Sequence, residues 1–198
     1  MKLLFVNACV RGEKSRTKIL CDDYIAKFLQ KKKDEDWTVE EVNLNELNLE
    51  AQNEVYISER DELIGKRDFA HPMFDLANQL IEADHILIGA PYWDFSFPAM
   101  LKIYLERCSV TGITFIYYDK GIPAPQCKAE SLVYLTTSGA PIGENNLGYD
   151  YVKALTTGLF GIKKTYFASA ECLDIIGVDV EKALSEAKDK ITDIIEAI

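Results

Sequence analysis

Positive charge, long apolar runs and closely spaced cysteines are scarce in this sequence, and each scarcity argues against a class of protein. The 198 residues include 22 Lys and Arg against 32 Asp and Glu, a formal net charge of −10, which disfavours nucleic acid and anionic membranes as partners. No run approaches the ~18 uninterrupted apolar residues of a membrane span. The apolar segment 1–6 meets Asn7 too early for a signal peptide, so we expect a cytoplasmic protein.

Common ligand motifs are missing as well. The five cysteines form no CxxC or other compact ligand spacing, so we expect mostly buried thiols, a reducing compartment and no metal site. Neither GxxxxGK[ST] nor GxGxxG occurs, which argues against ATP and against a nicotinamide bound in the Rossmann manner. The two histidines, His71 and His85, stand alone in the sequence, and we expect both to be structural.

Apolar strand-like runs alternate with amphipathic helical ones, and this pattern predicts an α/β fold whose parallel sheet is covered on both faces. The expected strands span 2–6, 37–44, 85–88, 131–137 and 165–170. The expected helices span 15–32, 98–108, 149–160 and 179–198, and the charged stretch 45–84 is expected to run over the surface, with a helix start at 58–61 and a helix ending near 81. Five strands favour one doubly wound, three-layer domain over residues 1–198, with the flavodoxin-like order 2-1-3-4-5.

In that order the loops after the first, third and fourth strands meet at one crevice. The first of these loops, residues 7–18, carries four basic residues and two hydroxyls at a helix start in an otherwise acidic protein. Unpaired amides at a helix N-terminus, together with Ser15 and Thr17, would hold a single phosphate. Alternatively, Ser15 or Thr17 only caps the helix, and this loop alone leaves both interpretations open.

The loops after the third and fourth strands carry aromatic and small residues instead of basic ones. Residues 89–98 form a rigid aromatic segment with two prolines and the carboxylate of Asp94, and residues 136–143 are small enough to approach a flat ligand closely. Each loop alone is also compatible with an ordinary turn. Together, a phosphate at one end and a planar ring at the other describe the shape of FMN.

Three segments resemble the FMN-dependent NAD(P)H quinone reductase and azoreductase family of the flavodoxin-like fold. Residues 11–17 (RGEKSRT) are similar to its phosphate loop, residues 90–102 (APYWDFSFPAMLK) to its P-[ML]-[YW]-N-F-x-[IV]-P-x-x-L-K segment, and residues 137–140 (TSGA) to the loop beside the isoalloxazine ring. The resemblance implies hydride transfer from NADH or NADPH through FMN to a quinone or azo acceptor, with ping-pong kinetics. It also implies a homodimer, which agrees with a helix 98–108 that is apolar on more than one side; packing of that helix under the stretch 45–84 is the alternative.

The same resemblance implies the site residues. Those expected at the cofactor are Cys9, Arg11, Ser15, Arg16, Thr17, Pro91, Tyr92, Trp93, Asp94, Phe95, Thr137, Ser138, Gly139 and Ala140. Those expected at the acceptor pocket are Tyr117, Tyr118 and Phe160, although a packed β-extension is an equal alternative for the two tyrosines. No side chain is expected to act as catalytic acid, base or nucleophile, because flavin N5 carries the chemistry.

The sequence departs from the family at three places. Asp94 stands where the family usually has Asn, residues 138–140 (SGA) replace a more basic or glycine-rich version of that loop, and Leu159 stands where an aromatic is common. A carboxylate near the flavin would disfavour an anionic reduced ring. Two other functions remain open: a flavodoxin-like electron carrier, which the long stretch 45–84 and the apolar helix 98–108 argue against, and a binding module that kept the fold without the cofactor.

Overall fold

In the computed structural model, which describes residues 1–118 and 121–198, five strands form a parallel sheet in the order β2-β1-β3-β6-β7. The strands are β1 (Lys2–Asn7), β2 (Thr38–Asn43), β3 (His85–Gly89), β6 (Ser131–Thr137) and β7 (Lys164–Ala170). The predicted order 2-1-3-4-5 is therefore confirmed for this sheet. The numbering differs because a separate antiparallel pair, β4 (Phe115–Tyr117) and β5 (Pro123–Pro125), precedes β6.

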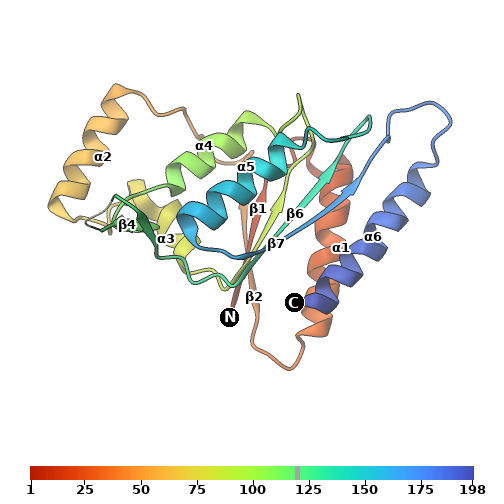
Figure 1. The fold of residues 1–198 in the computed structure, drawn as a ribbon, viewed down its shortest axis with the longest axis horizontal. Coiled ribbons are helices and arrows are strands. Elements are labelled where there is room, and N and C mark those ends of the chain that lie inside the picture. The colour runs from red at the N-terminus through yellow and green to blue at the C-terminus, as the bar shows by residue number, and fades with distance from the viewer. Residues whose placement is uncertain (119–120) are drawn as a thin grey trace.

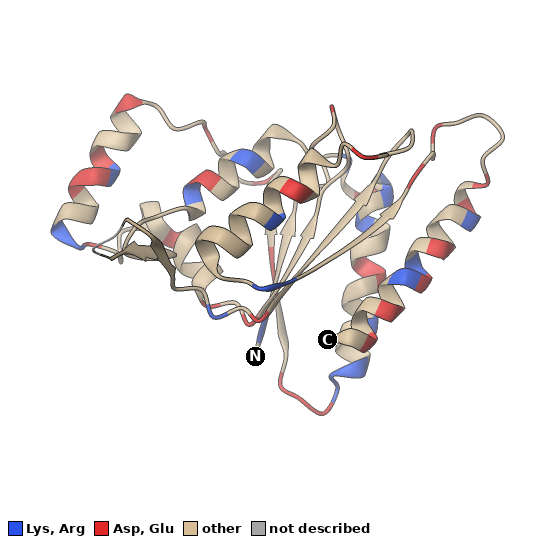
Figure 2. Cartoon of the chain, in the orientation of Figure 1, with Lys and Arg blue, Asp and Glu red and all other residues tan. Residues whose placement is uncertain are grey.

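Helices cover both faces of the sheet (Figure 1). α1 (Arg16–Lys31) and α6 (Val180–Ala197) pack on one face, and α3 (Asp75–Ile81), α4 (Ala99–Cys108) and α5 (Leu147–Leu155) pack on the other. Because both faces are covered, the inner strands are apolar without alternation: every residue of β3 and of β6 is buried. Charged residues instead lie on the helices, most visibly α2 and α6 (Figure 2).

The first helix, α1, buries one row of apolar side chains. Residues four apart lie on one face of a helix, and Leu20, Tyr24 and Phe28 are buried against the sheet. α6 packs beside α1 and contributes Ile191 and Ile195 to the same apolar cluster.

Two of the expected helices have different boundaries. The predicted helix start at Ser58 is wrong, because α2 (Glu54–Lys66) begins after Asn53, whose side chain accepts a hydrogen bond from the Tyr56 amide at 2.9 Å. No residue of α2 is buried, and the helix stands off the sheet (Figure 1). The expected helix 149–160 is α5 followed by one π-helical turn, η3 (Thr156–Phe160), which ends at Gly161 with φ 81°.

Both histidines have structural contacts. His71 accepts a hydrogen bond from the Met73 amide at the start of the short 3₁₀ helix η2 (Pro72–Phe74). His85 is buried, with Nε2 2.6 Å from the Tyr24 hydroxyl and Nδ1 2.7 Å from the Ser131 hydroxyl. Burial lowers the pKa of His85 to about 4, so the ring is neutral near neutral pH.

Because the His85 ring is buried, we expect the protein to become less stable as the pH falls. Between pH 6.5, the ordinary pKa of the side chain, and about 4, its value in the folded protein, the unfolded chain binds a proton that the folded chain does not. The free energy of unfolding therefore decreases as the pH falls, by about 2 kcal/mol from about pH 8 to about pH 5. Urea titrations at several pH values measure this loss. His85→Gln, which stays neutral, should lose clearly less, and equal losses in both proteins would contradict the prediction.

Candidate functional site

The loops after β1, β3 and β6 line one cavity at the carboxyl ends of the strands. Its volume is about 140 Å³, below the ~300 Å³ at which pockets enclose whole small ligands, so it can enclose one end of a larger molecule. Two of its lining residues, Leu173 and Asp174, come from a fourth loop, after β7, that the sequence did not point to. The other residues lining the cavity are predicted ones: Arg11, Ser15, Arg16, Thr17, Pro91, Tyr92, Trp93, Thr137, Ser138 and Gly139.

Backbone hydrogen bonds bring these loops together by extending the sheet beyond its strands. The Ala90 amide donates to Leu135 O at 3.1 Å, and the Tyr92 amide donates to Thr137 O at 3.0 Å. The buried hydroxyls of Thr17 and Thr137 lie 2.7 Å apart and join the start of α1 to the end of β6. The walls of the cavity are thus rigidly placed relative to the sheet.

The loop after β1 leads directly into the N-terminus of α1. A single 3₁₀ turn, η1 (Gly12–Lys14), leads into Ser15, which caps α1 by accepting a hydrogen bond from the Lys18 amide at 3.3 Å. The capping alternative is therefore realised for Ser15, whose hydroxyl can in addition donate one hydrogen bond. Thr17 differs, because its hydroxyl is already shared with Thr137.

Arg16 connects this loop to the one after β7. Its Nη1 donates to Leu173 O at 2.8 Å, and its Nη2 lies 2.5 Å from Asp174 Oδ1. The loop after β7 is held in turn by backbone bonds, from the Leu173 amide to Ser138 O at 3.0 Å and from the Asp174 amide to Gly139 O at 3.1 Å. A side-chain carboxylate thus pairs with the guanidinium of Arg16, which the family resemblance implies is at the cofactor.

The segment after β3 contains a tight turn under backbone strain. Trp93 and Ser96 exchange both of their backbone hydrogen bonds, at 3.1 and 2.7 Å, and the two residues between them have positive φ, 49° for Asp94 and 65° for Phe95. Asp and Asn tolerate this left-handed conformation, whereas it is costly for an aromatic residue. The turn gives a physical reason for Asp or Asn at position 94, and Phe95 is left 59% exposed.

The remaining predicted residues lie outside the cavity lining. Cys9 is fully buried beneath the loop, with its thiol 3.6 Å from Gly89 O, and the neighbouring Cys21 thiol lowers the pKa of Cys9. The other residues predicted at the cofactor that do not line the cavity are Asp94, Phe95 and Ala140. Of those predicted at the acceptor pocket, Phe160 is fully buried in the core beneath α4 and α5, whereas Tyr117 and Tyr118 are exposed at and just after β4. Their predicted roles stay predictions.

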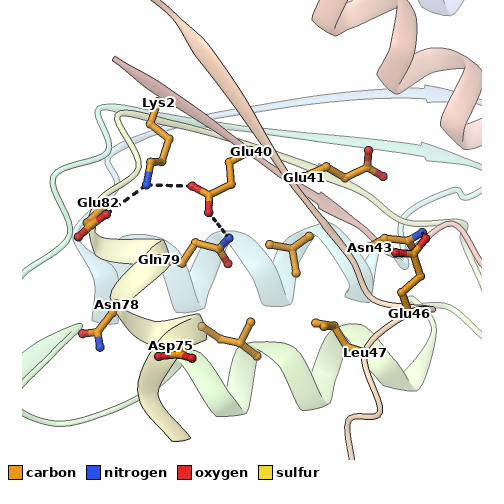
Figure 3. Close-up of a pocket in the computed structure, with 12 residues that line it drawn as sticks. Lys2, Glu40, Glu41, Asn43, Glu46, Leu47, Asp75, Asn78, Gln79 and Glu82 are labelled. Carbon is orange, nitrogen blue, oxygen red and sulfur yellow. Dashed lines mark hydrogen bonds and ion pairs between the residues drawn. The ribbon is translucent and has the colours of Figure 1, made fainter. Parts of the chain in front are cut away.

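A second and larger cavity, of about 520 Å³, lies beside β2 and α3 (Figure 3). Its polar groups satisfy one another: Lys2 Nζ lies 2.9 Å from Glu40 Oε2 and 3.1 Å from Glu82 Oε2, and Gln79 donates to Glu40 at 2.6 Å. The hydrogen bonds with both glutamates raise the pKa of Lys2. With Glu41, Glu46 and Asp75 also among its lining residues, this cavity repels a phosphate.

Within residues 1–118 and 121–198, no group of three or more His, Cys, Asp or Glu side chains is placed to hold a metal ion. The helices of the same residues include none that is both long and apolar enough to cross a membrane.

These features define an open α/β protein with a cavity at the carboxyl edge of its sheet that Arg11 and Arg16 help to line. A family model described as a flavodoxin-like fold matches residues 1–195, and the chain therefore belongs to this family. A Clostridium beijerinckii protein named FMN-dependent NADH:quinone oxidoreductase is 33% identical over 96% of this chain and 95% of its own length. A Coprothermobacter proteolyticus protein of the same name is 32% identical over 94% of each chain.

Solved structures confirm the fold. An azoreductase from Bacillus anthracis superposes with a TM-score of 0.84 at 22% identity, over 100% of both chains. A second Bacillus anthracis structure, titled as an FMN-dependent NADH-azoreductase in complex with FMN, also gives a TM-score of 0.84, at 17% identity over 99% of this chain and 98% of that one. The resemblance that the three sequence segments indicate is thus confirmed at the level of the family.

The strained turn yields a prediction about stability. Replacing Phe95 with Gly removes the Cβ that opposes positive φ, whereas Phe95→Ala keeps it. We expect Phe95→Gly to be about 1 kcal/mol more stable than Phe95→Ala, and chemical denaturation of the two variants measures the difference. Because both lose the same largely exposed ring, the comparison isolates the backbone. A Phe95→Ala variant as stable as Phe95→Gly would show that the turn is not strained.

Proposed function

We propose that this protein is an FMN-dependent oxidoreductase that passes electrons from NADH or NADPH to a quinone or azo acceptor. The observation that carries the proposal is the meeting of the three predicted loops around one cavity, with hydroxyl and guanidinium donors on one side and Pro91, Tyr92 and Trp93 on another. The names of the quinone reductase relatives, which match almost the whole chain, support the same activity.

The residues present fit the phosphate end of FMN. Arg11, Ser15 and Arg16 line the cavity, and the Arg16 guanidinium already binds an oxyanion there, the Asp174 carboxylate. Guanidinium groups bind carboxylate and phosphate in similar ways, by charge-assisted hydrogen bonds. Amides at the start of α1 add a partial positive charge. In our proposal Ser15 and the two arginines hold the phosphate, and Thr17 holds β6 in place.

The walls after β3 and β6 fit a flat, apolar ring. Trp93 and Phe95 are large apolar side chains left partly exposed beside the cavity, and Gly139 presents bare backbone to the cavity, so its amide can approach a ligand closely. Bound FMN would supply the hydride chemistry, taking two electrons from the nicotinamide and giving them to the acceptor. The protein's part is to orient the ring, exclude water and offer amides to developing negative charge.

The kinetics should be ping-pong, because the nicotinamide must leave before the acceptor reaches the same face of the ring. Parallel double-reciprocal plots for the two substrates are the expected pattern. An electron carrier is the alternative, and the relatives named as oxidoreductases favour the enzyme.

Loss of the Ser15 hydroxyl should weaken FMN binding through the phosphate alone. We expect Ser15→Ala to bind FMN about tenfold more weakly, which corresponds to about 1.4 kcal/mol, and to bind riboflavin, which lacks the phosphate, as the parent protein does. Fluorescence titration of the apoprotein measures both affinities. Asn53→Ala is the matched control, since it removes the cap of α2 away from the cavity. Unchanged FMN affinity in Ser15→Ala would place the phosphate elsewhere.

Anaerobic spectroscopy tests the activity itself. The FMN-reconstituted protein should lose its visible flavin absorbance on addition of NADH and regain it when a quinone such as menadione is added. A protein that binds FMN but is not bleached by NADH would favour the carrier, and one that stays colourless after reconstitution would favour the binding module.

We also propose a homodimer. Met100 and Ile103 of α4 are only partly buried, and an open groove beside the N-terminus of that helix is lined by Phe97, Leu147 and Tyr151, among others. Light scattering should give twice the mass of the chain, and Leu147→Glu should shift the protein toward the monomer. A monomeric parent protein at micromolar concentration would contradict this proposal.

A further inference from the structure

Arg16, the cation assigned to the ligand's phosphate, is already engaged by an anion of the protein itself. Its Nη2 lies 2.5 Å from Asp174 Oδ1, and Asp174 lines the same cavity as Arg16. The other carboxylate oxygen of Asp174 would lie 2.4 Å from a Cβ placed on Gly139. The carboxylate therefore sits directly against the wall that the ligand must approach.

This ion pair contributes little to holding the loop. The Asp174 side chain is 67% exposed and that of Arg16 28% exposed, and exposed pairs add little to stability because water screens them. The loop after β7 is held instead by the backbone bonds from the Leu173 and Asp174 amides to Ser138 and Gly139. Removing the carboxylate should therefore leave the loop in place.

The other charges of the phosphate loop do not compete in the same way. Lys18 Nζ lies 2.9 Å from Asp22 Oδ2 and 3.5 Å from Glu13 Oε1, on the flank of α1, and Lys18 does not line the cavity. Arg11 does line it. Among the residues that line the cavity, Asp174 is thus the carboxylate, and it pairs with Arg16.

We propose that Asp174 is an internal competitor for the phosphate site and sets its affinity for anions. The carboxylate pairs with Arg16 while the site is free, and it turns out toward solvent when a phosphate monoester takes the guanidinium. This inference rests on the proposed function for the identity of the ligand, but it concerns any phosphate that enters the cavity. Binding then includes the cost of breaking the Arg16–Asp174 pair, and an unpaired negative charge stays close to the bound phosphate.

The test compares Asp174→Asn with the parent apoprotein. The amide keeps the shape of the side chain and removes its charge, so FMN should bind about three- to tenfold more tightly at low salt, with riboflavin affinity unchanged. The gain should shrink as salt screens the removed charge. In the background of Arg16→Gln, which itself weakens FMN binding, Asp174→Asn should give a clearly smaller gain, because there is no ion pair to break and only the repulsion between the carboxylate and the phosphate is removed. Asp61→Asn, which removes a carboxylate from the exposed Arg60–Asp61 pair on α2, controls for net charge.

Inorganic phosphate, monitored by ³¹P NMR, separates this inference from the proposed function. Tighter phosphate binding by Asp174→Asn would support the inference even if FMN failed to bind, and that failure would count against the proposed function alone. Equal or weaker binding of both phosphate and FMN by Asp174→Asn would overturn the inference, as would an equal gain for riboflavin. Absence of phosphate binding in both proteins would also overturn it.

Discussion

The alignment of the parallel strands at their carboxyl ends determines the site. Asn7 of β1 pairs with Gly89 of β3, and Gly89 pairs with Leu135 of β6. The three strands are therefore aligned at the edge of the sheet from which the loops leave. A shift of one residue would turn every side chain of a strand to the other face and would disrupt the side-chain packing of both apolar layers. The loops then leave the sheet within a short distance of one another, and this proximity makes the cavity.

The two cavities differ in the charges of the residues that line them. The chain carries a net charge of −10. The larger cavity beside β2 is likewise mostly acidic, and its Lys2 is shared between two glutamates (Figure 3). The smaller cavity does the opposite, since Arg11 and Arg16 line it together with the start of a helix. Local charge and backbone dipoles, more than cavity size, therefore indicate where a phosphate binds.

Much of the fold, and the three loops of the site, could be predicted from the sequence because the strongest signals are local. The run 85–88 is apolar throughout, as an inner parallel strand must be, and the order of such runs indicates which loops meet. The start of α2 was missed because Ser58 and Asp61 match a capping pattern in a helix without a buried face. The wall formed by Leu173 and Asp174 could not be predicted, since it depends on how far β7 extends beside β6 and on the positive φ of Cys172. An aromatic residue such as Phe95 likewise carries no local signal for a left-handed turn.

If the loops after β1, β3, β6 and β7 form one binding site for a flavin phosphate, FMN must contact all four of them. Backbone amide NMR of the labelled apoprotein, recorded as FMN is added, tests it most directly. We expect the amides of residues 15–17, 92–93, 137–139 and 173–174 to shift together along one binding curve, while those of Glu40, Gln79 and Glu82 beside the larger cavity stay unchanged. Shifts centred on the larger cavity, or confined to one of the four loops, would contradict it.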